Sequence, residues 1–361
     1  MKLARAMIFT GPGKPLECCE YPVPEPAPGA LVVRITMATI CGSDIHTATG
    51  RRSEDTPAIL GHEITGRIIR MGTRITTDAL GQPLHENDRI TWSIAASCGK
   101  CVFCKDWHLP QKCLHLFKYG HASSLEWPHF NGGFAEIVYI RPGTTVLKVP
   151  DALSDEVVTP INCALATVMH GVEKMNLNGD DRVVVQGAGM LGIYAAAVLR
   201  DRGCRNVFVI DIDPVRLAMA EKFGASALSL NEYGPSGIVD IIKQNTDGFG
   251  ADAVLEVCGN PRSIATGVSL LRTGGCCVTA GLVFPGAAFE LDGQRMTKGM
   301  ITLSGIHNYR PEHLIAALKF IERTRDQYPY EELISAKFPL DDINRALAAA
   351  QEKKNIRVAI C

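Results

Sequence analysis

Cys41 and His62 are the residues of this chain whose types and spacing most directly suggest chemistry. They lie in the runs Cys41-Gly42-Ser43-Asp44-Ile45-His46 and Gly61-His62-Glu63, and another cysteine ends the segment Ile161-Asn162-Cys163. A thiolate, an imidazole and a third ligand from that later segment can hold zinc and leave its fourth position open to water or an alcohol. The sequence therefore predicts a catalytic zinc site.

Two residues beside Cys41 can handle the proton that an alcohol must lose at such a site. Ser43 can take this proton, and His46 can pass it to solvent. Asp44 and Glu63 are expected to orient the ligand imidazole and tune the metal. A single buried cysteine or histidine more often packs in a core than binds a metal, so the prediction depends on the spacing and the company of these residues.

Four cysteines form a second, tighter cluster at Cys98, Cys101, Cys104 and Cys113. Four thiolates at this spacing match a closed tetrahedral zinc site, which would stabilise a lobe over residues 98–113 and not catalyse. A redox Cys-x-x-Cys pair is the main alternative, although the third cysteine three residues on argues against it. The flanking residues do not form a basic patch, so a zinc ribbon for nucleic acid is disfavoured.

A glycine motif follows the apolar run 183–185. Gly187, Gly189 and Gly192 surround Met190 and Leu191 at the expected start of a helix, where backbone amides can approach a pyrophosphate. The two alternatives are a glycine turn kept only for packing and a site that prefers NADP.

The acid that follows the next apolar run decides between the nucleotides. Asp211 ends that run, where it would accept a hydrogen bond from the ribose and repel a 2′-phosphate, which favours NAD. Arg216, one helical turn further on, can cover the adenine or ribose, and it could also partly offset the acid.

The elements that must position these residues change in character along the chain. The first part contains short β-branched runs with many prolines and glycines, which are typical of a barrel-like β domain. The expected strands are 31–36, 63–69, 88–92 and 134–140.

The pattern changes near Asp151, after which strands alternate with helices and predict a parallel sheet covered on both faces. The expected strands are 182–186, 207–210, 251–257 and 275–282, with helices 190–200 and 261–271 and another after Pro214. Helices 311–322 and 341–351 and strand 357–360 are expected to return to the first domain. The predicted domains are therefore 1–155, 156–304 and a C-terminal return, 305–361.

Composition excludes several classes of protein. The chain has 361 residues, 46% hydrophobic and 21% charged, and a formal net charge of −1, so no electrostatic footprint for nucleic acid or an anionic membrane is expected. No apolar run reaches the roughly 20 residues of a membrane span. The N-terminus lacks the features of a signal peptide, and the odd number of cysteines, 13, suits reduced thiols. A cytoplasmic protein is therefore expected.

Several other residues are expected to have a structural role only. The cysteines interpreted as small apolar fillers are Cys18, Cys19, Cys204, Cys258, Cys276, Cys277 and Cys361. The histidines assigned to the surface or to packing are His85, His108, His115, His121, His129, His170, His307 and His313. The aromatic residues Trp92, Trp127, Phe130 and Phe134 are assigned to the core, with a substrate pocket as the alternative. Arg51 and Arg52 are expected to be an exposed pair, with an anion clamp as the alternative.

Taken together, these motifs resemble the zinc-dependent alcohol dehydrogenases of the medium-chain dehydrogenase/reductase superfamily over nearly the whole chain. The resemblance implies a GroES-like β domain and a Rossmann domain, homodimers or homotetramers, and a small-molecule alcohol or ketone as the substrate. It also implies that Cys163 completes the catalytic zinc site with Cys41 and His62. Thr167 would lie near the nicotinamide, and Cys258 and Gly281 would complete the cofactor-binding set.

Two departures from the family pattern matter. Many polyol-type relatives carry Glu where Cys163 stands, and the gap from Cys104 to Cys113 is one residue longer than usual. The segment 109–121 resembles a branch that acts on bulky cyclic terpene alcohols such as 5-exo-hydroxycamphor. It also resembles dehydrogenases of phosphonate catabolism, for which Arg51 and Arg52 would bind the anion. A nucleotide-binding structural protein without catalysis is the alternative from a different class.

Overall fold

The computed structural model describes residues 2–352 and 354–361. The chain forms two compact units. The first contains residues 1–163, 310–325 and 330–361, and the second contains residues 164–309 and 326–329. The C-terminal part of the chain thus belongs mostly to the same unit as the N-terminal part.

The first unit is built on β-sheets. A seven-stranded sheet has the order β10-β6-β5-β3-β18-β17, with β9 also paired to β3, and a three-stranded sheet has the order β2-β1-β4. The strands are β1 (Leu3–Phe9), β2 (Glu17–Pro22), β3 (Leu31–Ile40), β4 (Ala58–Ile59), β5 (Glu63–Met71), β6 (Arg89–Trp92), β7 (Ala95–Ala96), β8 (Phe117–Lys118), β9 (Ile137–Ile140), β10 (Val146–Lys148), β17 (Ile334–Phe338) and β18 (Arg357–Ile360). The helices are α1 (Gly42–Ala48), α2 (Val102–Lys105), α3 (Asp155–Val158), α10 (Pro311–Thr324) and α11 (Ile343–Gln351), with 3₁₀ turns η1 (Pro110–Lys112), η2 (Thr159–Asn162), η3 (Tyr330–Leu333) and η4 (Leu340–Asp342).

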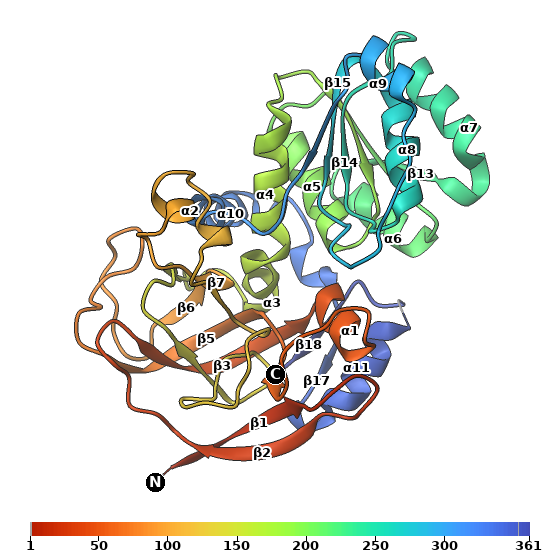
Figure 1. Ribbon diagram of the computed structural model, residues 1–361. Helices are drawn as coiled ribbons and strands as arrows, with labels where there is room; N and C mark the ends of the chain where they lie inside the picture. The colour runs from red at the N-terminus through yellow and green to blue at the C-terminus, as the bar shows by residue number, and fades with distance from the viewer. Residues whose placement is uncertain (1, 353) are drawn as a thin grey trace. The chain divides into compact units, whose positions relative to one another are not determined.

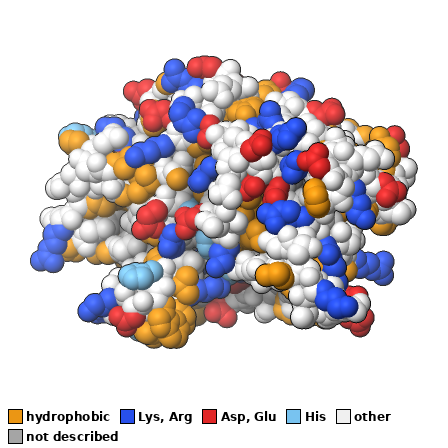
Figure 2. Space-filling view, turned by 90° about the horizontal axis from the view of Figure 1, so that it is seen from above, with side chains coloured by type: hydrophobic (Ala, Val, Ile, Leu, Met, Phe, Trp, Pro, Cys, Tyr) orange, Lys and Arg blue, Asp and Glu red, His pale blue; other side chains and the backbone are white. Residues whose placement is uncertain are grey.

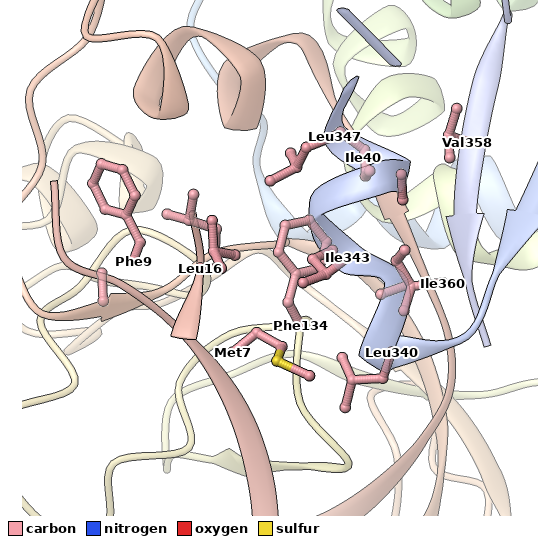
Figure 3. Close-up of a cluster of buried hydrophobic side chains, with 14 residues drawn as sticks. Met7, Phe9, Leu16, Ile40, Phe134, Leu340, Ile343, Leu347, Val358 and Ile360 are labelled. Atoms are coloured by element: carbon pink, nitrogen blue, oxygen red, sulfur yellow. The ribbon is translucent and has the colours of Figure 1, made fainter. Parts of the chain in front are cut away.

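The two ends of the chain share one core in this unit. Strand β18 pairs antiparallel with β3, so that Val358 lies opposite Ile40. Helix α11 packs Ile343 and Leu347 into the same apolar cluster, as Figure 3 shows. Burial of these aliphatic side chains stabilises the end of β3 that leads into Cys41.

The second unit is a Rossmann fold. Its six strands are all parallel in the order β13-β12-β11-β14-β15-β16, and helices lie on both faces of the sheet, with α4 and α5 on one side of β14 and β15 and α8 on the other (Figure 1). The strands are β11 (Arg182–Gln186), β12 (Asn206–Asp211), β13 (Ser226–Ser229), β14 (Ala251–Glu256), β15 (Leu271–Thr279) and β16 (Thr302–Gly305). The helices are α4 (Ala164–Met175), α5 (Met190–Asp201), α6 (Pro214–Lys222), α7 (Leu230–Gln244), α8 (Pro261–Leu270) and α9 (Gly293–Lys298).

The predicted fold class, a GroES-like β domain with a Rossmann domain, is confirmed, but several elements differ. The expected strand 134–140 begins only at Ile137, because Phe134 sits in a loop whose backbone bonds to Leu60. The expected strand 275–282 runs from Leu271 to Thr279. Helix α7 was not predicted because Gly234, with φ +63°, and Pro235 interrupt its pattern.

The residues that were expected to have only a structural role are placed as predicted in some cases and not in others. Among the four aromatic residues, Trp92, Phe130 and Phe134 are fully buried as predicted, whereas Trp127 is exposed. The prediction of apolar fillers is wrong for Cys18, Cys258 and Cys361, because all three are exposed. Cys18 lies on the edge strand β2, Cys258 follows β14, and Cys361 ends the chain.

The surface carries charges of both signs. On the face drawn in Figure 2, acidic and basic side chains are interspersed. Among the described residues, no helix is both long and apolar enough to cross a membrane.

Candidate functional site

The first unit brings the predicted ligands Cys41, His62 and Cys163 together. Their ligand atoms and a carboxylate oxygen of Glu63 all lie within 4.8 Å of one another. Cys41 precedes α1, His62 and Glu63 stand at the start of β5, and Cys163 follows η2. Because zinc binds sulfur at about 2.3 Å and nitrogen at about 2.0 Å, tetrahedral ligand atoms lie roughly 3.3–3.8 Å apart. The residues therefore fit a zinc ion. We call this set the mixed cluster.

The Asp44 carboxylate connects the two segments that carry Cys41 and His62. Its carboxylate accepts hydrogen bonds from the backbone of Cys41 at 2.8 Å and of Gly61 at 3.0 Å, and one oxygen lies 3.3 Å from Nδ1 of His62. The Asp44 side chain is fully buried. Asp44 thus lies against the ligand imidazole, and its orienting role stays a prediction.

Gly61 is needed for a close backbone approach next to His62. Its φ is +84°, and a Cβ atom added there would lie 2.7 Å from the ring of Phe134. Both the backbone conformation and the available space therefore favour glycine at this position.

Glu63 is held from outside the mixed cluster by two partners. Thr39 donates a hydrogen bond to one of its oxygens, and Nη2 of Arg357 lies 3.2 Å from the other. Arg357 is a residue that sequence reasoning missed. The signal in the sequence was a charged residue at the start of the apolar strand β18. In the structure, Arg357 is only 7% exposed.

Asn162 connects the segment that carries Cys163 to the rest of the mixed cluster. Its amide nitrogen donates to the backbone oxygens of His62 and Trp92, each at 3.1 Å. The position of Cys163 thus depends on a fully buried polar side chain one residue earlier.

The electrostatics of the mixed cluster suit a cation. A hydrogen bond from Cys163, and to a lesser degree the charge of Arg357, holds the pKa of Cys41 well below its usual value, although burial opposes this shift. Burial lowers the pKa of His62, but Asp44 and Cys41 outweigh it and raise that pKa to about 10. Burial raises the pKa of Glu63 to about 8. Several acidic groups lie close together here and compete for protons. A bound cation would take the place of these protons.

Ser43 lies beside the ligands of the mixed cluster. Its hydroxyl lies 3.3 Å from Nε2 of His62. His46 lies one turn further along α1 and is half-buried. The structure therefore places Ser43 beside the ligands and His46 on the same helix.

The four cysteines of the lobe also come together. The sulfur of Cys101 is 3.5 Å from that of Cys104 and 3.8 Å from that of Cys113, and Cys113 is 3.4 Å from Cys98. Zinc–sulfur bonds of about 2.3 Å require tetrahedral sulfurs about 3.8 Å apart. The four sulfurs therefore fit a closed zinc site.

The surroundings of the lobe favour thiolates only in part. A backbone amide of Leu114 lowers the pKa of Cys101 to about 6, whereas burial and the neighbouring thiols raise that of Cys104 to about 12. Four sulfurs this close cannot all lose their protons without a cation between them.

In the second unit, the glycine motif forms the turn between β11 and α5. Gly187 has φ +109°, and a Cβ atom added there would lie 2.9 Å from Cβ of Cys258. A Cβ atom on Gly192 would lie 1.7 Å from the oxygen of Gly187, so the helix packs directly on the turn. Gly189, at the start of α5, has open space on its Cα, which suits the approach of a pyrophosphate. Met190 and Leu191 begin α5, and Met190 is buried.

Asp211 stands at the end of β12 as predicted and binds the turn itself. Its Oδ2 accepts a hydrogen bond from the backbone of Ala188 at 2.6 Å, and its Oδ1 accepts from Ile212 and Asp213. Arg216 lies 3.7 Å from Asp213 on α6. Thr167 is half-buried on α4.

A buried carboxylate that sequence reasoning missed ties the loops after β14 and β15. Glu256 is fully buried and accepts hydrogen bonds from the backbone of Gly259 at 2.6 Å and of Gly281 at 3.2 Å, and from the hydroxyl of Thr279 at 2.9 Å. The predicted residues Cys258 and Gly281 lie on these loops.

A second charged group next to the mixed cluster was also missed. Glu54 accepts hydrogen bonds from Nε of Arg52 and Nδ1 of His121, and the ring of His121 lies 4.9 Å from that of His62. No spacing rule connects residue 54 with residue 121, so the sequence held no signal for this contact.

Comparisons with known proteins agree with this geometry. The model of the alcohol dehydrogenase GroES-like domain matches residues 27–151, and the model of the zinc-binding dehydrogenase matches residues 191–323. A 5-exo-hydroxycamphor dehydrogenase of Pseudomonas putida is 32% identical over 96% of this chain and 95% of its own length.

Other similar proteins carry different names. An L-threonine 3-dehydrogenase of Stenotrophomonas maltophilia is 26% identical over 99% of both chains. The solved structure of an alcohol dehydrogenase from Thermotoga maritima matches with a TM-score of 0.94 and 30% identity, and covers 100% of this chain and 99% of its own.

Proposed function

Because the chain belongs to the zinc-dependent alcohol dehydrogenases of the medium-chain dehydrogenase/reductase superfamily, we propose that it reversibly oxidises a secondary alcohol to a ketone with NAD. The observation that carries this proposal is the mixed cluster, in which two sulfurs and one imidazole nitrogen meet within 4.8 Å beside the hydroxyl of Ser43. Cys41, His62 and Cys163 would hold the catalytic zinc ion. The four cysteines of the lobe would hold a structural one.

The chemistry requires an electrophile for the alcohol oxygen and an acceptor for hydride, and bound zinc and NAD supply these two functions. Thr39 and Arg357 engage both oxygens of Glu63, and these contacts would restrain the carboxylate so that the substrate oxygen could reach the metal. Asp44 fixes the orientation of His62. Ser43 would accept the alcohol proton at its hydroxyl oxygen and release its own hydroxyl proton toward His46, which would in turn release a proton to solvent.

Nucleotide binding is assigned to the second unit. Asp211, at the end of β12, would accept a hydrogen bond from a ribose hydroxyl, and its charge would disfavour a 2′-phosphate, which supports NAD over NADP. Arg216 and Thr167 would contact the adenosine and nicotinamide ends. Asp211→Ala should raise the KM for NAD far more than the KM for NADP, and equal effects on both would remove this role.

The best specific substrate is a bulky cyclic alcohol of the terpene type, such as 5-exo-hydroxycamphor. The relative at 32% identity supports this choice, while L-threonine is the competitor that relatives at 26–28% identity suggest. We further propose a homodimer or homotetramer, as is usual in the superfamily.

The test combines metal analysis with a substrate screen. The zinc-loaded protein is assayed for NADH absorbance with cyclic secondary alcohols, L-threonine and hydroxyalkyl phosphonates. Cys41→Ala should abolish turnover and leave NADH binding, measured by fluorescence, nearly unchanged. Cys361→Ala, at an exposed position away from the mixed cluster, is the control. Retained turnover in a zinc-free Cys41→Ala protein would refute the proposal.

A further inference from the structure

We propose that Arg52 and His121, which contact the Glu54 carboxylate, and the neighbouring Lys118 bind a second oxygen function on the alcohol substrate. This inference rests on the proposed function and names the substrate class: an alcohol that also carries a carbonyl, carboxylate or phosphonate group. The four residues are called the polar quartet below.

One oxygen atom organises the polar quartet. Oε1 of Glu54 lies 2.7 Å from Nε of Arg52 and 2.9 Å from Nδ1 of His121. The three side chains are only 12%, 21% and 4% exposed, respectively, so these are enclosed contacts and not mobile surface pairs. Enclosed charged hydrogen bonds of this kind hold their donors in fixed positions.

The polar quartet lies directly beside the mixed cluster. The ring of His121 is 4.9 Å from the ring of His62. The backbone between Lys118 and His121 also approaches closely, because a Cβ atom on Gly120 would lie 2.4 Å from the oxygen of Gly61 and 3.1 Å from Cβ of His62. A substrate held at the mixed cluster would therefore have the polar quartet within reach.

Lys118 adds a second cation to this group. It ends the short strand β8, is partly buried, and accepts a hydrogen bond at its backbone oxygen from the backbone of His121 at 3.3 Å. When the mixed cluster is loaded, the two thiolates are matched by the metal charge. Glu54 is then the one anion of the quartet, against the two cations Arg52 and Lys118.

This excess positive charge points to a substrate group that accepts hydrogen bonds. A partly buried cation is costly unless an acceptor lies against it, and a ligand can supply that acceptor. A site for a plain hydrocarbon alcohol would gain nothing from such a cation. An oxygen acceptor on the substrate, positioned some distance from its hydroxyl group, would complete the arrangement and orient the alcohol for oxidation.

The test uses Lys118→Met and three substrates that share one ring: cyclohexanol, 4-hydroxycyclohexanone and 4-hydroxycyclohexanecarboxylate. Because a hydrogen bond from a charged group contributes about 1.5–3 kcal/mol, kcat/KM for the two substituted alcohols should fall about 10- to 100-fold. The value for cyclohexanol should change less than about threefold. The ketone and carboxylate arms distinguish a neutral acceptor from an anionic one. Lys118→Arg should restore most of the loss, and Lys105→Met, an exposed change in the lobe, is the control.

Calorimetry keeps this test separate from that of the proposed function. Binding of cyclohexanecarboxylate to the zinc-loaded protein with NADH should weaken by the same factor in Lys118→Met, with the zinc content unchanged. An equal fall of kcat/KM for all three substrates, or unchanged binding of the carboxylate, would overturn the inference. If the wild type oxidises no alcohol, the proposed function fails, and calorimetry alone then decides whether the polar quartet binds an acceptor.

Discussion

The lobe of four cysteines and the mixed cluster, both in the first unit, achieve similar ligand spacing in different ways. The lobe draws every ligand from residues 98–113, and backbone amides, such as that of His115 to Cys113, point at its sulfurs. The mixed cluster draws its ligands from three distant segments and is surrounded by buried side chains of opposite charge, Asp44 and Arg357. A local site needs little support from the fold, whereas a dispersed one needs a network to hold it.

The comparison also separates the expected roles. Four sulfurs fill every position around a zinc ion, so the lobe can only stabilise. In the mixed cluster, Glu63 is engaged by Thr39 and Arg357, which would leave three ligands and an open position at a bound zinc ion. Chemistry is therefore expected at the site with the more elaborate surroundings.

The largest expected effect comes from removing a ligand of the mixed cluster. Cys163→Ala should lower kcat at least about 1000-fold, equivalent to about 4 kcal/mol of transition-state stabilisation. The zinc content should fall from two ions per chain to one, as measured by mass spectrometry. Cys204→Ala, another buried cysteine, should change neither value. A fully active Cys163→Ala protein with two zinc ions would place the catalytic site elsewhere.

Removing a ligand of the lobe should have the complementary result. Cys101→Ala should also lose one zinc ion, but its main effect should be a fall in the unfolding temperature of about 5 °C or more, because zinc no longer stabilises residues 98–113. While the protein remains folded at 25 °C, kcat should stay within about threefold of the wild type. Calorimetry and steady-state kinetics on one preparation measure both quantities. A loss of kcat as large as that of Cys163→Ala would end the distinction between the two sites.

The same contrast explains what the sequence could and could not predict. The lobe and the glycine motif are local, so spacing alone indicated four sulfurs that meet and a turn before α5. Cys41 and His62 were also found, because Ser43 and Glu63 accompany them in short motifs. Arg357, Glu256 and Glu54 were missed, since each acts on residues that only the folded chain brings near.

The parallel sheet shows the same limit for secondary structure. Strands β11 and β12 are buried apolar runs and were predicted, whereas β13 exposes Ser226 at a sheet edge and was not. Strand β17 was missed for a similar reason, because its alternating burial is short and it depends on pairing with β18.

A change outside the ligands should have an intermediate effect at the mixed cluster and none at the lobe. Asp44→Asn keeps the shape of the side chain but replaces one acceptor oxygen with an amide NH₂ group. This donor must then face another donor, the backbone N–H of Cys41 or Gly61. We expect kcat/KM to fall about 10- to 100-fold, as is typical for partners of metal ligands. Steady-state kinetics and zinc affinity should both report the loss. Asp55→Asn, at an exposed position, is the control, and an unchanged Asp44→Asn enzyme would show that His62 needs no orientation.

The smallest expected effect tests whether Glu63 is held back from the metal. Thr39→Val preserves the volume of the side chain but removes the hydroxyl that donates to Glu63. A buried acceptor left without this donor costs about 1–3 kcal/mol of folding stability, and the carboxylate becomes freer to turn toward the open position. We therefore expect kcat to fall a few-fold, about tenfold at most, because Glu63 then competes with the substrate. Thr39→Ser, which keeps the hydroxyl, should retain the wild-type rate. If Thr39→Val instead leaves kcat unchanged while the stability falls, Arg357 alone restrains Glu63.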